Sequence, residues 1–471
     1  MSHLAPDSDS KTIHGTFRLL VPKTAEHPID ARSIELDGVA WVLVEHARIP
    51  SASEKPDFVC LSYSWGRGRA LNPFDRDRPM SDRTISALES TVKALRPVAI
   101  WVDALCVPSS EEARAACLRS MGAIYSAAAR VVVVLTASCA ELLEQIHLER
   151  QIDPASILVL EHEDWVSRAW TYQEIVNSRS AQFLAEGSVG ASVSGNDLLR
   201  VTTSAISDYK KQKGLSSFRF RSLFPRLDAF ESLIADYMTA DFLERSAIQV
   251  MAAIDRRSSE RAEDYFNAMI GAITTESPAL ADLSLHPAEY FMRICEAKGD
   301  YSFIYSTAPR DEAPGRGWRP VAGRMPVVVT WYGHSERQTA CQHPTHLQLN
   351  NMCQMLPGSI DSDGRSLIDW WLETDTSTCS SGEVAALILE RLREAGFTGC
   401  GEHLELEHGY FFPQAPLVHR REVVAVSAEV AWIHGAPALV LSGDETGMRR
   451  FVGVGVFVGR VPKVGQPLDI V

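Results

Sequence analysis

The chain has no long hydrophobic run, no apolar leader and no excess of basic charge. None of its 471 residues belong to a stretch of the ~20 apolar residues that a membrane span needs. Met1–Thr12 is polar, so no secretory signal is visible. With 46 Lys and Arg against 60 Asp and Glu, the net charge is −14, which argues against nucleic acid or an anionic membrane as the main partner. Nine cysteines in so long a chain do not suggest a disulfide framework, so we expect reduced thiols and a cytoplasmic location.

The common catalytic signatures are also missing. The sequence has no G-x-G-x-x-G, P-loop, H-E-x-x-H or G-x-S-x-G motif. Cys341, His343, His346 and Cys353 are zinc-ligand types, but their spacing matches no common zinc finger, and Pro344 stiffens the loop. We therefore predict no metal site.

The composition indicates several folded regions. Hydrophobic residues make up 45% of the chain, which is enough for a substantial core, and the length favours more than one domain. We expect a disordered tail over 1–12, an α/β domain over 13–205, a helical extension over 206–320 and a β-rich region over 321–471. One helix, at Ser381–Ala395, is expected to interrupt the β-rich region.

Short apolar runs alternate with helical segments in the α/β domain. Two strands are expected first, at Thr16–Val21 and Val39–Val44. Five more follow between helices, at Phe58–Tyr63, Val98–Asp103, Val131–Leu135, Ile157–Leu160 and Arg179–Leu184. Alternation at this spacing predicts a parallel sheet with helices on both faces.

Polar residues follow two of the expected strands. Ser62, Tyr63, Ser64, Trp65 and Gly66 end the first buried strand. Asp103 ends the next. Ligands of such sheets bind at the carboxyl ends of the strands, so these residues are candidate site residues.

The stretch Ser167–Glu174 is the second candidate element. It is compatible with a helix on which Trp170 and Glu174, four residues apart, share one face. Taken alone, this pattern indicates packing by Trp170 and a solvated or capping carboxylate at Glu174.

Four motifs occur in order: CLSYSWG (60–66), IWVDALCV (100–107), MGAIY (121–125) and RAWTYQE (168–174). They resemble motifs of the heterokaryon-incompatibility (HET) domain of filamentous fungi, which read LSY-x-WG, W-x-DA-x-C-I, M-x-x-IY and R-x-WT-x-QE. The resemblance covers about residues 15–205. It implies an incompatibility or innate-immunity effector that causes programmed cell death.

HET domains are in turn similar to Toll/interleukin-receptor (TIR) domains. TIR domains have a strand that ends in Ser-Tyr or Ser-Phe, a second strand that ends in Asp, and a helix with Trp and Glu at the spacing of Trp170 and Glu174. The similarity implies a TIR/flavodoxin-like sheet and hydrolysis of NAD, with Glu174 as the essential residue. NAD is then a substrate, no cofactor is expected, and activity depends on self-association.

The chemistry of this reaction suits a single carboxylate. Cleavage of the nicotinamide–ribose bond has an oxocarbenium-like transition state, and nicotinamide leaves as a neutral ring, so no general acid is needed. Glu174 would stabilise the positive charge, Trp65 or Trp170 would stack on a ring, and Arg67 or Arg69 would hold the diphosphate.

Other functions stay open on the sequence alone. The domain could be a non-catalytic module that triggers cell death by assembling with itself or with a partner. Alternatively, the protein could sense a nucleotide, with the β-rich region binding the trigger. Residues 205–471 could then act as a restraint or sensor. A carboxylate-lined cleft at the strand ends favours the enzyme, and a flat, closed surface favours the signalling module.

Overall fold

The computed structural model describes residues 17–50, 54, 56–188, 191–239, 245–259, 261–278, 280–329, 337–417, 422–443 and 448–471. The chain divides into two compact units. Unit 1 comprises 1–214, 224–242 and 257–290, and unit 2 comprises 215–223, 243–256 and 291–471. The units are therefore interleaved along the chain, whereas the domains expected from the sequence are consecutive. The tail expected over 1–12 lies outside the described residues.

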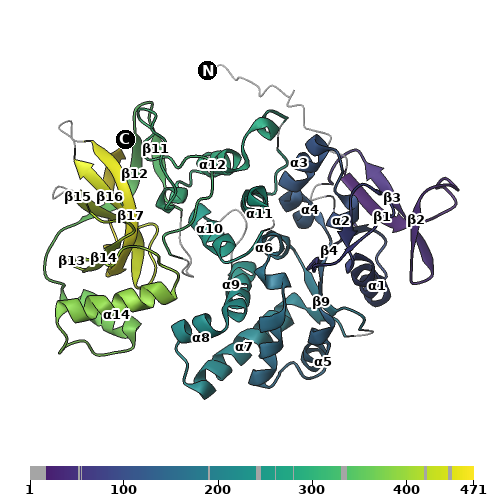
Figure 1. The fold of residues 1–471 in the computed structure, drawn as a ribbon, viewed down its shortest axis with the longest axis horizontal. Helices are drawn as coiled ribbons and strands as arrows, with labels where there is room; N and C mark the ends of the chain where they lie inside the picture. The colour runs from purple at the N-terminus through teal and green to yellow at the C-terminus, as the bar shows by residue number, and fades with distance from the viewer. Residues whose placement is uncertain are drawn as a thin grey trace. The chain divides into compact units, whose positions relative to one another are not determined.

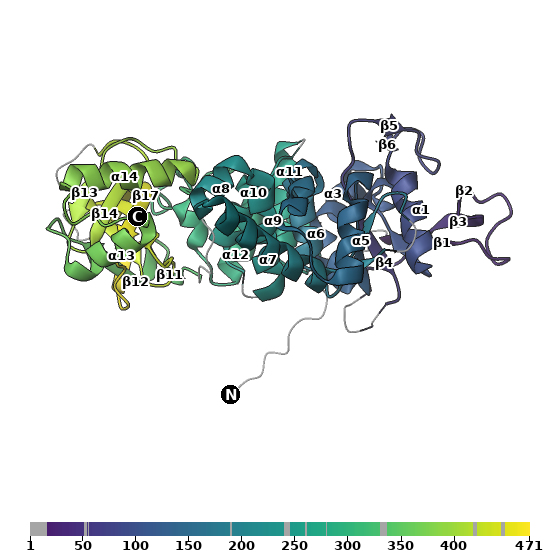
Figure 2. The same ribbon diagram turned by 90° about the horizontal axis from the view of Figure 1, so that it is seen from below.

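Unit 1 is built on an eight-stranded sheet in the order β10-β9-β8-β4-β7-β1-β3-β2, in which β2 and β3 form one outer edge (Figures 1 and 2). Its strands are β1 (Phe17–Pro22), β2 (Ser33–Leu36), β3 (Val39–His46), β4 (Val59–Tyr63), β7 (Ile100–Trp101), β8 (Arg130–Leu135), β9 (Ala181–Ala185) and β10 (Val193–Ser194). A separate hairpin pairs β5 (Arg69–Ala70) with β6 (Met80–Ser81).

The sheet is mixed, with a parallel centre. Strands β7, β4, β8 and β9 run parallel to one another, whereas β1, β3, β2 and β10 pair antiparallel. In chain order the parallel strands lie 2-1-3-4, the order of the first four strands of a flavodoxin-like sheet, with the switch point between β4 and β8. The predicted α/β class is confirmed, although the parallel sheet is only the centre of a mixed one.

In the described residues, nine α-helices lie wholly within unit 1. They are α1 (Thr84–Leu95), α2 (Asp103–Cys106), α3 (Glu111–Arg119), α4 (Met121–Ala127), α5 (Ala140–Glu149), α6 (Ala169–Val176), α7 (Gly195–Lys213), α9 (Pro225–Thr239) and α11 (Ala262–Ile273). A further helix, α12 (Pro287–Ala297), crosses the boundary between the two units. Helices α1, α5, α6 and α7 pack directly on strands of the sheet.

Two strand predictions in this unit need correction. The apolar run Ile157–Leu160 lies in a 3₁₀ helix, Pro154–His162, not in a strand. Pro154 occupies the start of that helix, where its fixed φ angle and missing N–H are tolerated, and the position beside β8 is taken by β9. The strand expected over Val98–Asp103 is only Ile100–Trp101, and Asp103 begins α2.

Unit 2 contains a second sheet, in the order β11-β12-β15-β16-β17-β14-β13, with β18 paired to β12 and β17. Its strands are β11 (Ala340–Gln342), β12 (Leu347–Met355), β13 (Leu404–Leu406), β14 (Gly409–Pro413), β15 (Glu422–Ser427), β16 (Gly435–Gly443), β17 (Arg449–Gly459) and β18 (Gln466–Ile470). Besides most of α12, unit 2 contains the helices α8 (Ser217–Leu223), α10 (Ala247–Asp255), α13 (Ser362–Leu372) and α14 (Ser381–Glu394).

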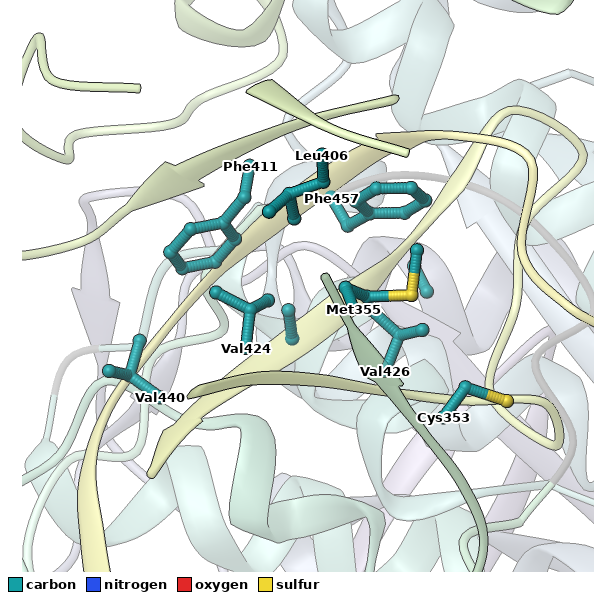
Figure 3. Packing of buried hydrophobic residues seen from close by; sticks show 10 residues of the cluster. Cys353, Met355, Leu406, Phe411, Val424, Val426, Val440 and Phe457 are labelled. Atoms are coloured by element: carbon teal, nitrogen blue, oxygen red, sulfur yellow. The ribbon is translucent and has the colours of Figure 1, made fainter. Parts of the chain in front are cut away.

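The buried faces of this sheet form a tight apolar cluster. Met355, Phe411, Val424, Val426 and Phe457 are among its members (Figure 3). The predicted β-rich region is confirmed, but one detail is wrong. A second helix, α13, interrupts it in addition to the one expected.

Among the described residues, no helix combines the length and the apolar character that crossing a membrane requires.

Candidate functional site

The helix α6 carries the motif residues Trp170 and Glu174 and is almost entirely enclosed. The Thr171 hydroxyl lies 2.7 Å from the carbonyl oxygen of Trp165 and 2.9 Å from that of Arg168, and its proton is shared between these two acceptors, which closes the turn that leads into the helix. Every residue of α6 except Trp170 is buried. Trp170 is half-buried and is therefore the residue of this helix that meets the surface.

Glu174 lies beneath the carboxyl end of β4. The Ser62 hydroxyl donates a hydrogen bond to Glu174 Oε2. The Trp165 indole Nε1 donates to Ser62 Oγ at 2.7 Å, so the serine proton is directed toward the carboxylate. Glu174 is 5% exposed.

The environment of Glu174 makes its ionisation costly. Burial raises the pKa of the Glu174 carboxyl to about 7, and the charge of Asp103 adds to the rise. The hydrogen bond from Ser62, the charge of Arg168 and the nearby Tyr125 hydroxyl act in the opposite direction. Near neutral pH, this carboxyl is therefore shared between its charged and neutral forms.

A second buried carboxylate, Glu163, fixes the position of Trp165. Its Oε2 accepts hydrogen bonds from the Thr136 backbone N–H at 2.8 Å and from the Thr136 hydroxyl at 2.7 Å. Its Oε1 accepts from the Trp165 backbone N–H at 3.1 Å. Glu163 thus ties the end of β8 to the residue that supports Ser62.

Asp103 is the carboxylate at the end of β7. The Trp65 indole Nε1 donates to Asp103 Oδ2 at 2.9 Å, and the Ala104 backbone N–H donates to Oδ1 at 2.7 Å. Burial raises the pKa of Asp103, while the nearby charges of Arg168 and Arg78 oppose the rise. The two strand-end motifs predicted from the sequence therefore meet through Trp65 and Asp103.

The turn after β4 is held by arginines. Gly66 has φ +65°, a conformation that favours glycine, and the Arg69 guanidinium donates to the carbonyls of Gly66 and Gly68 at 3.1 and 3.0 Å. The same guanidinium lies over the Trp65 ring, 5.5 Å from its centroid. Arg83 donates to the Ser64 carbonyl at 2.9 Å, which anchors the start of the turn.

A cavity of about 570 Å³ opens at this edge of the sheet in unit 1. Its charged lining consists of seven arginines and three aspartates. These residues are Arg67, Arg69, Arg78, Arg114, Arg168, Arg226, Arg261, Asp103, Asp164 and Asp264. Trp65 and Trp170 also line it. The cavity lies in the size range of small-molecule sites, and its excess of cationic side chains favours an anionic ligand.

The predicted site residues divide into two groups. Ser64, Trp65, Gly66, Asp103 and Trp170 line the cavity. Ser62, Tyr63 and Glu174 are buried and are not among the lining residues. The Tyr63 hydroxyl lies 2.7 Å from Thr84 Oγ1, as expected of a packed tyrosine. Glu174 is nevertheless close to the cavity, because it accepts a hydrogen bond from Ser62, two residues before the lining residue Ser64, and shares α6 with the lining residue Trp170.

Most of the cavity arginines were not predicted from the sequence. Only Arg67 and Arg69 were expected to contact a ligand, and Arg78, Arg114, Arg226 and Arg261 come from segments far apart in the chain. Arg168 is the first residue of the motif RAWTYQE, and this position is the one feature of the sequence that could have identified a further cavity arginine.

The cysteine and histidine side chains near residue 341 make contacts with one another and with the backbone. The rings of His343 and His346 stack, with centroids 4.4 Å apart, and the Cys353 thiol faces the Val464 carbonyl. In the part of the chain that the structure describes, no three His, Cys, Asp or Glu side chains are grouped as metal ligands.

Residues 58–174 match the family model described as Heterokaryon incompatibility protein (HET). The resemblance drawn from the four motifs is thus confirmed, and this segment, which includes β4, α6 and Glu174, is a HET domain. The description of that family model points to heterokaryon incompatibility. No curated protein and no solved structure matches the chain.

Proposed function

We propose that the HET domain binds NAD in the cavity of unit 1 and hydrolyses the nicotinamide–ribose bond, with Glu174 as the key carboxylate. The observation that carries this proposal is a cationic, tryptophan-lined cavity at the carboxyl ends of parallel strands, next to a buried glutamate with a raised pKa. The cavity is a cleft with three aspartates in its lining, and a cleft of this kind favours an enzyme over a signalling module with a flat surface.

The arrangement of Glu174 suits the stabilisation of a developing cation. The transition state places positive charge on the ribose, and a buried carboxylate acts strongly there because little water screens it. Ser62 holds Oε2 of the carboxylate in one orientation. Since nicotinamide leaves as a neutral ring, no residue has to protonate it, and NAD is substrate rather than cofactor.

The cavity lining provides groups for the rest of the dinucleotide. Arginine guanidinium groups bind phosphate oxygens in a bidentate manner, and seven arginines line this cavity together with only three aspartates. Trp65 and Trp170 offer aromatic faces for nicotinamide or adenine. Loss of cytoplasmic NAD, promoted by self-association of the chain, would then cause the cell death associated with HET domains.

The direct test is the rate of NAD loss with the purified full chain at high concentration. We expect Glu174→Gln to lower the rate by about 10²–10³, as is typical when one electrostatic partner of a transition state is removed. Glu149→Gln, an exposed substitution on α5, is the matched control and should retain the wild-type rate. Equal rates for Glu174→Gln and wild type would remove Glu174 from the mechanism.

One observation favours a non-catalytic signalling module instead. Glu174 is 5% exposed and is not among the cavity-lining residues, so the carboxylate reaches a ligand only if the site rearranges slightly on binding. If the chain self-associates and kills cells while NAD levels stay constant, and Glu174→Gln kills equally well, the signalling module is the correct function.

A further inference from the structure

One wall of the cavity comes from outside the HET segment. The family match ends at Glu174, yet Arg226, Ser258, Ser259, Arg261 and Asp264 also line the cavity. All five belong to unit 1, in the stretches 224–242 and 257–290. The site is therefore incomplete without residues that the family motifs do not contain.

The backbone joins this wall to the start of α6. The Ser258 N–H donates to the Ser167 carbonyl at 2.7 Å, and the Ala169 N–H donates to the Ser258 carbonyl at 2.9 Å. These bonds form a parallel bridge between Arg168 and Ser258. The lining residues after Ser258 consequently have a fixed position relative to Arg168 and Trp170.

Side-chain packing also fixes the position of α6 relative to α9 and α11. Helix α11 packs on α6 and α4 (Figure 1), and a Cβ atom added at Gly271 would lie 1.4 Å from Gln173 Oε1. The Tyr172 hydroxyl donates to Asp236 Oδ2 at 2.9 Å, and the Arg257 guanidinium lies 4.9 Å from the centroid of the Tyr172 ring. Helices α9 and α11 thus hold α6 as part of one core.

The two arginines of this wall differ in their interactions. Arg226 pairs with Asp164, with Nη2 and Oδ1 2.8 Å apart, so much of its charge is already compensated. The side chain of Arg261 has no hydrogen-bond or ion-pair partner among the residues that the structure describes. An arginine that lines a cavity without a partner is available to an anionic ligand.

We propose that residues 258–264 form the second wall of the ligand site and that Arg261 contacts a phosphate group of the bound dinucleotide. This inference rests on the proposed function for the identity of the ligand. The HET segment holds Glu174 and one set of arginines, and Arg261 approaches the ligand from the other wall. The ligand-binding unit is then the whole of unit 1 rather than the family segment.

The test is calorimetric titration of the full chain with NAD, with inorganic pyrophosphate as a second probe. Arg261→Gln should weaken the binding of both probes by about tenfold or more, because a charge-assisted hydrogen bond is lost. Arg261→Lys keeps the charge and should bind with intermediate affinity. Arg200→Gln, which removes an arginine of α7 that does not line the cavity, should bind as wild type does.

The outcomes separate this inference from the proposed function. If wild type binds NAD and Arg261→Gln binds it equally well, the second wall is wrong, whereas hydrolysis by Glu174 is unaffected. If Arg261→Gln weakens binding but Glu174→Gln hydrolyses NAD at the wild-type rate, the wall stands and the catalytic proposal fails. If neither probe binds to wild type, both proposals are refuted. Unchanged circular dichroism of the Arg261 variants excludes misfolding as the cause.

Discussion

The raised pKa of Glu174 predicts a pH-dependent stability difference between the wild-type chain and Glu174→Gln. Burial, reinforced by the charge of Asp103, raises the pKa of Glu174 from 4.5 to about 7. Between these values, the folded chain binds the proton and the unfolded chain releases it. The stability that wild type derives from this group therefore falls as the pH rises from about 4.5 to about 7.

The magnitude follows from the size of the shift. One pKa unit corresponds to about 1.4 kcal/mol, so the whole shift corresponds to about 3 kcal/mol, of which about 2–3 kcal/mol develops between pH 5 and pH 8. Glutamine does not ionise and lacks this dependence. Relative to wild type, Glu174→Gln should therefore become more stable by about 2–3 kcal/mol over this interval.

The assay is urea unfolding of both chains at pH 5, 6.5 and 8, followed by tryptophan fluorescence. Any fixed effect of the amide, such as an altered hydrogen bond to Ser62, contributes equally at each pH and cancels in the comparison. Glu149→Gln, at an exposed position, should follow wild type at every pH. A difference between Glu174→Gln and wild type that stays constant from pH 5 to pH 8 would refute the reasoning.

Two further predictions concern packing and capping. Gly271→Ala should destabilise unit 1 by about 1–3 kcal/mol, because the added Cβ overlaps Gln173. Gly382→Ala in α14 should be nearly neutral, because the added Cβ has no atom within 4 Å. Thermal unfolding of both variants measures the difference. Asp361→Ala should destabilise unit 2 by about 1 kcal/mol at pH 7, because Asp361 caps α13 by accepting from the Gly364 N–H. Burial raises the pKa of Asp361, but hydrogen bonds from Arg460, Gly364 and His408 outweigh this effect and lower it to about 2. The stabilisation by Asp361 is therefore present above pH 3.8 and is lost as the pH falls through 2. Urea unfolding of both chains at pH 7 and at pH 2 measures this loss.

The strands that the sequence predicts best are those with an unambiguous apolar run. Val131–Leu135 is β-branched almost throughout and is buried on both faces, as the central strand of a parallel sheet requires. Ile157–Leu160 is equally apolar but forms a 3₁₀ helix. A run of four residues carries no period that distinguishes a strand from a buried helical turn, so the pattern alone could not decide.

Helix α13 was missed although its signals are present. Asp361 is a good N-cap residue, and the buried Ile368, Trp371 and Leu372 recur at helical spacing. The β-type runs on either side of this segment outweighed these signals.

The candidate site was predictable where its residues are contiguous in sequence. Trp65 and Asp103 follow neighbouring parallel strands, and neighbouring strand ends must meet, as their 2.9 Å hydrogen bond shows. Arg261 could not be found in this way. It reaches the cavity through the pairing of Ser258 with Ser167 and through helix packing, neither of which leaves a local pattern.

The interleaving of the two units has a consequence for how such a protein can be cut or recombined. The chain passes from one unit to the other after residues 214, 223, 242, 256 and 290, so any single break inside this stretch leaves a piece of one unit covalently tied to the other. A fragment that stops near residue 205 loses α9 and α11, and with them the supports of α6. If such a fragment failed to kill cells, the cause would be its damaged fold. The failure would therefore not count against a restraining role for the residues that were removed. Gene fusion or exon exchange at these positions would be equally damaging, so the two units are expected to be inherited as a pair.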